Sequence, residues 1–421
     1  MKEGISAKSI YRKDYMAYPW DVNHLDIHFD IGSDTTTVRA VMEFQIKDAA
    51  KASQDIVLNG HDLQLMSMSL NGQLLSSDDY AIEGETLTIS NAPPKSVVET
   101  EVRIHPSSNS ALEGLYVSGS FLLTQCEALG FRKITLFPDR PDVMTRYRVT
   151  LEAEKSEFPI LLSNGNQKGS GDLPGGRHWV RWEDPFPKPS YLFALVAGDL
   201  ALVEDHFKTR SGRDVSLRIY VESENLDRCE HAMESLINSM RGDEERFVVE
   251  YDLDIYHIVA TNDFNMGAME NKSLNIFNSK YVLARPDTAT DADYQGIEGV
   301  IGHEYFHNWT GNRVTCRDWF ELTLKEGLTV FRDEESSADM HSRAVTRIRV
   351  IRDLRNRQFP EDDGPMSHPI RPDQYVEINN FYTATVYQKG ATIIRMYHTL
   401  LGEEGFQKGM KLYFERHDGQ A

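Results

Sequence analysis

Two histidines and a glutamate in the segment HEYFH have the spacing of a metal site. His303 and His307 are four residues apart, so on an α-helix their side chains would lie about 40° apart around the axis and about 6 Å apart along it. Both imidazoles could then bind one metal ion from the same face. Glu304 would be rotated by about 100° from His303, where it could reach a water molecule on the metal without binding the metal.

A third ligand could come from Glu326, which lies in a second apolar, helix-compatible stretch, LTLKEGLTVF. Three protein ligands leave the fourth position of a tetrahedral zinc ion open, which is typical of catalytic rather than structural zinc. The alternative is a chance HExxH pattern, which about a few per cent of chains with 14 histidines would contain.

The residues around HEYFH favour a real helix with one buried face. Apolar residues recur at helical spacings, namely Ile297, Val300, Ile301, Phe306 and Trp309. Thr288, Thr290 and Asp291 offer side-chain oxygens that could cap the start of this helix. Gly311 or Asn312 could end it.

Length and charge limit the class of protein. A chain of 421 residues exceeds one ordinary core, so two or more domains are expected. The net charge of −20, from 45 basic and 65 acidic residues, argues against a nucleic-acid partner and suits cationic ligands such as peptide amines.

The cysteines and the first residues predict a cytoplasmic protein. Cys126, Cys229 and Cys316 are too few and too scattered for a disulfide framework, so we expect buried free thiols in a reducing compartment. The start, MKEGISAKSIYRKDYMAYPW, lacks the apolar segment of a secretory signal. Nothing approaches the roughly 18 consecutive apolar residues of a membrane span.

The chain changes character near residue 200. Before it, apolar and polar residues alternate as in half-buried strands, for example in Leu25–Ile31 and Val38–Ile46. After it, we expect strands at 215–221, 255–260 and 276–283, and helices at 226–247, 297–309, 320–335, 336–356 and 387–401. The predicted domains are residues 1–199, a β domain that ends with an apolar strand at 191–197, and residues 200–421, an α+β domain.

One combination of motifs resembles a known family. GAMEN at 267–271, then HExxH, eighteen intervening residues and Glu326, is similar to the signature of the gluzincin aminopeptidases of the M1 family. The similarity runs from the early strands to the last residues. One departure is Lys325, where many members of the family carry Asn; we expect it to affect substrate preference more than chemistry.

The resemblance implies a multi-domain α+β fold: an all-β, saddle-like N-terminal domain followed by a thermolysin-like catalytic domain. Members of the family carry further domains, so we expect residues 200–421 to be an incomplete catalytic domain and the chain to be part of something longer. The resemblance also implies one Zn²⁺ per chain, bound by His303, His307 and Glu326. It makes Glu304 the general base and Tyr387 the donor to the oxyanion.

The resemblance further implies residues that recognise a substrate's free amine. Glu270 would be the main amine ligand, with Gln125 and Glu127 from the segment LTQCEA beside it. The other substrate-binding residues would be Met266, Gly267, Ala268, Met269 and Asn271, with Met266 against the first side chain. From the residues alone, Asp333 could accept a hydrogen bond from a metal-bound imidazole, and an ordinary solvated carboxylate is about as probable there.

These features together predict a zinc aminopeptidase that acts on peptides with a free N-terminus. We expect a cytoplasmic monomer without a nucleic-acid partner, and peripheral attachment to the inner membrane is the alternative location. An endopeptidase with the same zinc chemistry is a second interpretation, but it would have no use for an amine-binding cluster. A binding protein that has lost catalysis is a third, and the intact set of His303, Glu304, His307, Glu326 and Tyr387 argues against it.

Overall fold

The computed structural model describes residues 9–32, 34–48 and 54–421. These residues divide into two compact units. We call residues 18–308 the β-rich unit, and residues 9–17 together with 309–421 the helical unit. The first eight residues, on which part of the signal-peptide argument rests, lie outside the described residues.

The largest sheet of the β-rich unit has eight strands in the order β14-β15-β12-β2-β3-β9-β5-β6. Their bounds are Trp20–Asp30 (β2), Thr36–Ile46 (β3), Gln64–Leu70 (β5), Gln73–Leu74 (β6), Lys95–Ile104 (β9), Thr145–Glu154 (β12), Asn166–Asp172 (β14) and Arg177–Lys188 (β15). Strands β2 and β12 are parallel, and the other neighbours are antiparallel. The predicted alternation is confirmed, because Leu25, Ile27 and Phe29 are all buried on one face of β2.

Two smaller sheets complete the N-terminal part of this unit. One contains β10 (Gly114–Ser118), β11 (Phe121–Gln125), β16 (Leu195–Gly198) and β13 (Ile160–Ser163), in that order. The other contains β4 (Ile56–Asn59), β8 (Thr86–Ile89) and β7 (Ala81–Glu83). Phe193, two residues before β16, packs against the large sheet: its ring lies 5.8 Å from that of Phe29 in β2 and 5.1 Å from that of Phe131.

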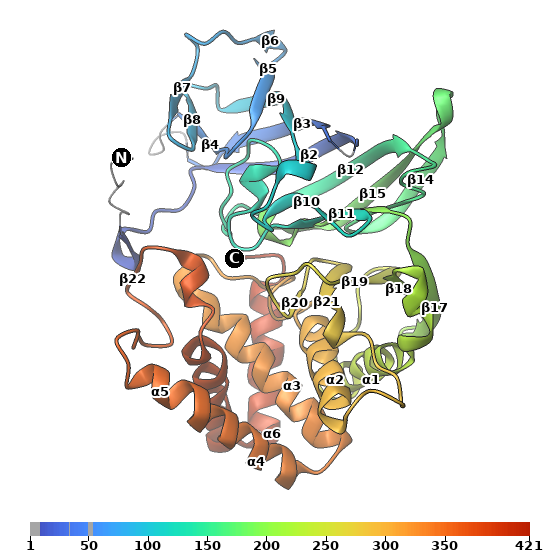
Figure 1. Cartoon of the computed structure of the whole chain (residues 1–421). Coiled ribbons are helices and arrows are strands. Elements are labelled where there is room, and N and C mark those ends of the chain that lie inside the picture. Colours follow the sequence, from blue (N-terminus) through green and yellow to red (C-terminus); the bar gives the residue numbers. More distant parts are fainter. Residues whose placement is uncertain (1–8, 33, 49–53) are drawn as a thin grey trace. The chain divides into compact units, whose positions relative to one another are not determined.

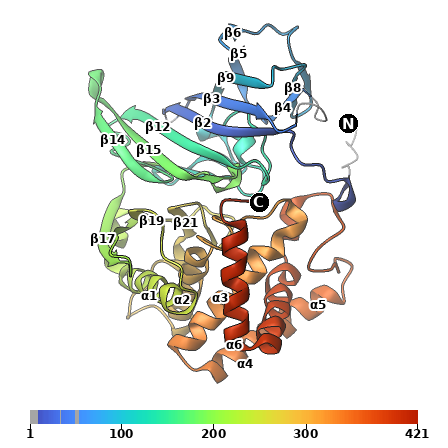
Figure 2. The same cartoon turned by 180° about the vertical axis from the view of Figure 1, so that it is seen from behind.

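The rest of the β-rich unit is a five-stranded mixed sheet covered by two helices. Its order is β17 (Ala201–Lys208), β18 (Asp214–Val221), β19 (Ile255–Thr261), β21 (Leu274–Asn278) and β20 (Ala268–Met269). Helices α1 (Glu230–Arg246) and α2 (Asp291–Phe306) lie side by side on the same face of this sheet (Figures 1 and 2). Leu236 and Met240 of α1 and Ile297 and Ile301 of α2 are buried in the core between them and the strands.

The helical unit contains one pair of short strands and four α-helices. Strand β1 (Ile10–Tyr11) pairs with β22 (Gln374–Tyr375). The α-helices are α3 (Glu326–Met340), α4 (Arg343–Asp353), α5 (Phe359–Asp362) and α6 (Gly390–His417), and α3 packs against both α4 and α6 (Figures 1 and 2). Buried ion pairs reinforce this packing: Arg395 of α6 lies 2.9 Å from Glu334 and 2.5 Å from Glu335 of α3.

The predicted fold class is confirmed, while several element bounds are corrected. The described residues before 223 form strands and short 3-10 helices, as expected. The expected strand at 276–283 is β21, which ends at Asn278, because the side chain of Asn278 accepts a hydrogen bond from the backbone N–H of Lys280 and starts a 3-10 turn. The expected strand at 191–197 is a 3-10 turn (Ser190–Leu192) followed by β16.

The helix predictions found the elements but misjudged their ends. The expected helix at 226–247 is α1, which begins at Glu230 after a 3-10 helix, Ser223–Arg228. The expected helix at 320–335 divides into a 3-10 helix, Trp319–Leu324, and α3. The one at 336–356 covers the end of α3, then α4 and the start of a π-helix, Leu354–Gln358. The one at 387–401 is a π-helix, Thr385–Lys389, that leads into the much longer α6.

Three further predictions concern the cysteines, the membrane and the domain boundary. All three cysteines are buried and lie outside any disulfide, as expected. Within the described residues, every helix is too short or too polar to cross a bilayer. The predicted boundary between residues 199 and 200 falls between β16 and β17 and stays a prediction.

Candidate metal and substrate site

Helix α2 carries the HEYFH segment and is fixed at its start by a capping box. The side-chain oxygen of Thr290 accepts a hydrogen bond from the N–H of Asp293 at 3.3 Å, and the Asp293 carboxylate accepts one from the N–H of Thr290 at 2.8 Å. This pattern satisfies two N–H groups that a helix start leaves unpaired. The expected cap at Thr290 is confirmed. The expected stop at Gly311 or Asn312 is wrong, because α2 ends at Phe306 and the chain turns at His307.

His303 and His307 face each other on α2, as their spacing predicted. Their Nε2 atoms are 2.9 Å apart, and the ring planes are nearly perpendicular, at 87°. His307 is buried and His303 is half-buried. Two imidazole nitrogens at this distance can be stabilised in two ways. One ring donates its N–H to the other, or the lone pairs of both point at a shared cation. The pair is therefore a suitable start for a metal site.

Two buried carboxylates gather beside His307. Glu270, Glu304 and His307 each offer a ligand atom, and these atoms all lie within 4.8 Å of one another. Burial of like charges at such a distance is costly unless a proton or a cation compensates them. Burial raises the pKa of the neighbouring Tyr256 phenol well above its ordinary value, and the negative charges of Glu304 and Glu270 raise it further. This corner of the β-rich unit therefore favours a bound cation.

Glu270 is placed by the short edge strand β20. Ala268 and Met269 pair with Phe277 and Ile276 of β21, and the N–H of Asn278 donates to the carbonyl of Gly267 at 2.9 Å. Gly267 lies close to an aromatic ring, since a Cβ atom there would come within 3.1 Å of Tyr281. Glu270 and Asn271, both buried, follow directly after the end of this strand.

Gln125 and Glu127 lie beside the same segment, although they are far from it in sequence. Gln125 ends β11, and its amide nitrogen lies 3.3 Å from the sulfur of Met266 and 3.1 Å from the carbonyl of Glu127. Carboxylate oxygens of Glu127 and Glu270 lie within 4.8 Å of each other. The structure therefore brings together the two segments that were expected to recognise a substrate amine.

Glu326 and Tyr387 belong to the helical unit, on neighbouring elements. Glu326 is the first residue of α3 and is buried, with one carboxylate oxygen 2.5 Å from the ammonium of Lys325. Tyr387 lies in the π-helix Thr385–Lys389, a rare backbone form that is frequent at functional sites. The hydroxyl of Thr323 donates to the carbonyl of Val386 at 3.0 Å and ties the two segments together.

Asp333 follows Glu326 by seven residues on α3, which is about two helical turns, and it is half-buried. Its hydrogen bond to a metal-bound imidazole stays a prediction.

Several polar residues around the site were missed by the sequence analysis. Tyr256 and Lys272 are buried beside it, and Asp252 and Asn308 bind Lys272. A lysine directly after the Glu-Asn pair of the GAMEN motif was the one available signal, but a lysine is usually solvent-exposed.

Two protein-family models match most of this chain. Residues 21–192 match the Peptidase M1 N-terminal domain, and residues 231–421 match the Peptidase family M1 domain. The chain belongs to peptidase family M1. Its M1 relatives include aminopeptidase N of Escherichia coli (strain K12), which is 60% identical over 98% of this chain and 47% of that protein. Aminopeptidase N of Haemophilus influenzae is 58% identical over 99% of this chain and 48% of that protein.

A solved aminopeptidase structure supports the fold. Aminopeptidase A of Legionella pneumophila, crystallised in complex with aspartic acid, superposes with a TM-score of 0.91 at 33% sequence identity, over 98% of this chain and 48% of that one. The chain spans about half the length of the curated relatives it matches.

A close approach of two glycines sets the spacing of α3 and the Tyr387 segment. A Cβ atom on Gly327 would lie 3.0 Å from the backbone of Gly390. We expect Gly327→Ala to lower the free energy of unfolding by about 1–3 kcal/mol, because the added methyl group would press on the backbone of Gly390, which cannot easily move aside. Gly409→Ala, on the exposed face of α6 with nothing within 4 Å, is the matched control. It should raise stability by up to about 1 kcal/mol through helix propensity. Chemical denaturation of both variants measures the difference, and equal effects would contradict the packing argument.

Proposed function

We propose that this protein is a zinc-dependent aminopeptidase that hydrolyses the N-terminal peptide bond of peptides with a free α-amine. The observation that carries the proposal is the grouping in the β-rich unit of a facing histidine pair with the buried carboxylates of Glu304, Glu270 and Glu127. Membership of peptidase family M1 and the high identity to proteins named aminopeptidase N support it.

We propose one zinc ion per chain, bound by His303, His307 and Glu326. The donor set fits zinc, because imidazole nitrogen and carboxylate oxygen are ordinary ligands of this metal and the two imidazoles already converge. The assignment of Glu326 rests on its spacing of eighteen residues after HEYFH. When bound, zinc lowers the pKa of a coordinated water and polarises the scissile carbonyl.

Two residues of the chain would then act on the substrate: Glu304 would transfer the proton, and Tyr387 would stabilise the developing negative charge. Glu304 accepts the proton of the attacking water and passes it to the leaving amine. Tyr387 donates a hydrogen bond to the carbonyl oxygen as negative charge develops there. Both roles need a side chain that the protein holds in place and shields from bulk water. Glu304 meets this condition because it is buried.

Recognition of the substrate amine would fall to Glu270, Glu127 and Gln125. Two carboxylates and one amide oxygen are acceptors for the three N–H groups of an ammonium, and charge-assisted bonds would favour a free N-terminus over an internal peptide bond. Met266, Gly267, Ala268, Met269 and Asn271 would line the space for the first residue. An endopeptidase is the second candidate, and only the amine-binding role of this cluster separates the two. The cytoplasmic location and the monomeric state expected from the sequence stay predictions.

Neutralising the proposed base tests the mechanism. In the full-length protein, Glu304→Gln should retain zinc and lower turnover by about 10²-fold or more, because the ligands are intact and the proton acceptor is lost. Glu298→Gln, the same change on the same helix, is the control and should keep nearly full activity. Metal content and the rate of hydrolysis of an amino acid arylamide are measured together. Substantial activity in Glu304→Gln would rule out its role as the base.

Removing the proposed oxyanion donor tests the role of Tyr387. Tyr387→Phe should lower kcat by about 10²–10³-fold with little change in KM, since the hydrogen bond forms mainly in the transition state. Tyr397→Phe, on the exposed face of α6, should leave both constants unchanged. A loss confined to KM would show that Tyr387 binds the ground state instead.

Acetylation of the substrate separates the aminopeptidase from the endopeptidase. One peptide is assayed in free and N-acetylated forms, with the products identified by mass. Acetylation should lower cleavage by about 100-fold or more, because buried carboxylates would lose a charged partner. Glu270→Ala should weaken cleavage of the free peptide strongly at unchanged zinc content. Internal cleavage of the acetylated peptide at a comparable rate would favour the endopeptidase.

A further inference from the structure

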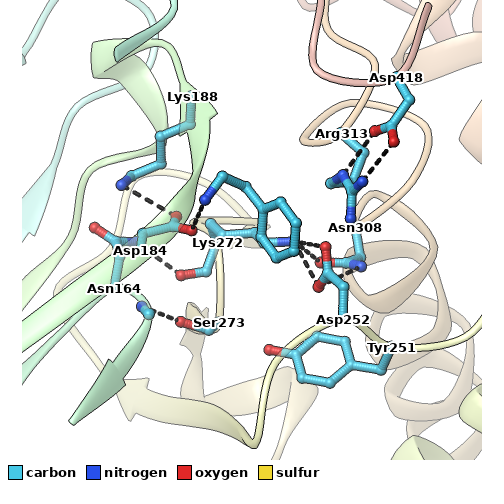
Figure 3. Close-up of polar contacts among 12 residues, drawn as sticks. Asn164, Asp184, Lys188, Tyr251, Asp252, Lys272, Ser273, Asn308, Arg313 and Asp418 are labelled. Carbon is cyan, nitrogen blue, oxygen red and sulfur yellow. Dashed lines mark hydrogen bonds and ion pairs between the residues drawn. The ribbon is translucent and has the colours of Figure 1, made fainter. Parts of the chain in front are cut away.

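Lys272 is a buried lysine with a complete set of partners. Only 2% of its side chain is exposed, and its ammonium donates to the two carboxylate oxygens of Asp252 at 2.7 and 2.6 Å and to the amide oxygen of Asn308 at 2.8 Å. The amide nitrogen of Asn308 donates back to Asp252 at 3.3 Å (Figure 3). The three N–H groups of an ammonium are thus all used, in a closed triangle of side chains.

The backbone at Lys272 is held from the other side by the N-terminal part of the β-rich unit. The buried side chain of Asn164 donates to the carbonyl of Lys272 at 2.8 Å, and the N–H of Gly165 donates to the hydroxyl of Ser273 at 2.7 Å (Figure 3). Asn164 is itself fixed, because it also donates to the carbonyl of Leu192 and accepts from the N–H of Ala194. Lys272 is therefore anchored at both its main chain and its side chain.

The triangle joins the two elements that carry the candidate site. Lys272 comes two residues after Glu270, and Asn308 comes directly after His307. Asp252 lies in the segment just before β19, in the middle of the sheet. Because Asn308 follows the end of α2, its bond to Lys272 fixes that end of the helix against the segment of Glu270. Within this unit, the ligand atoms of Glu270 and His307 lie within 4.8 Å of each other.

We propose that Lys272 is a positioning residue, which through Asp252 and Asn308 sets the distance between Glu270 and the histidine pair of α2 and thereby the preference for ligands with a free amine. This inference rests on the proposed function, in which Glu270 binds the substrate amine. Loss of a residue that holds a ligand-binding side chain in place, without contacting the ligand itself, typically lowers affinity or activity by about 10- to 100-fold.

A second buried lysine of the same unit supplies a matched control. Lys188 is also 2% exposed, and its ammonium lies 3.2 Å from the buried carboxylate of Asp184 (Figure 3). The same ammonium lies 3.8 Å from the centre of the Tyr147 ring. Asp184 lies in β15 and Tyr147 in β12, so the ion pair and the ring contact of Lys188 are formed within the large sheet. Lys188→Met therefore removes an ion pair of similar burial and leaves the hydrogen bonds of the triangle in place, although it also removes a like charge that repels Lys272.

The experiment compares binding of two probes to full-length zinc-loaded protein by calorimetry. One probe is an amino acid hydroxamate with a free amine, and the other is acetohydroxamate, which lacks the amine. Lys272→Met should lower the affinity ratio of the two probes by about 10- to 100-fold, toward the ratio of Glu270→Ala. Lys188→Met should keep the wild-type ratio, even if both lysine variants lose similar stability in chemical denaturation.

Two further variants keep the outcome decisive. Asn308→Ala leaves the ion pair of Lys272 and Asp252 intact, so it tests the link to α2 if Lys272→Met fails to fold, and it should lower the same ratio by about tenfold. Lys272→Arg keeps the charge and should restore part of the ratio. An unchanged ratio in Lys272→Met or Asn308→Ala, beside a lost ratio in Glu270→Ala, would overturn the positioning role alone. A wild-type protein that binds both probes equally would instead overturn the proposed amine recognition.

Discussion

Burial of acidic groups close to one another is the constraint on which the candidate site depends. Glu270, Glu304 and His307 offer ligand atoms within 4.8 Å of one another, and Glu127 lies within the same distance of Glu270. In the folded protein without a bound cation, such groups repel each other and favour the uptake of a proton. Their arrangement is useful only where cations arrive to compensate the charge. A metal ion and a substrate ammonium are the two cations that the proposed function supplies.

The surrounding structure holds these groups in place before any cation binds. Helix α2 is capped at its start by Thr290 and Asp293 and packs through Ile297 and Ile301 on the five-stranded sheet. The edge strand β20 and the triangle of Lys272, Asp252 and Asn308 fix the segment that carries Glu270. Preorganised polar groups avoid the cost of reorganisation when charge develops, which is the usual source of electrostatic catalysis.

Buried lysines recur next to the acidic residues of both units. Lys272 follows Glu270 by two residues in the β-rich unit, and Lys325 lies 2.5 Å from Glu326 in the helical unit. The Lys325 ammonium thus places a positive charge beside a carboxylate that we propose as a metal ligand. The ammonium of Lys272 donates to both carboxylate oxygens of Asp252, which compensates its charge. Lys325, by contrast, shares the carboxylate of Glu326 directly.

The sequence by itself determined the features that depend on spacing along the chain. The four-residue interval placed His303 and His307 on one face of a helix, and alternation identified β2 and β3. The cap of α2, Thr290, was one of three candidates beside Thr288 and Asp291. Tertiary structure decided where α2 and α6 end and that Gln125 meets Met266 across 141 residues. It also decided that Lys272 is buried and not solvated. The physical reason is that local spacing fixes direction within one element, whereas burial and partners depend on long-range contacts between elements.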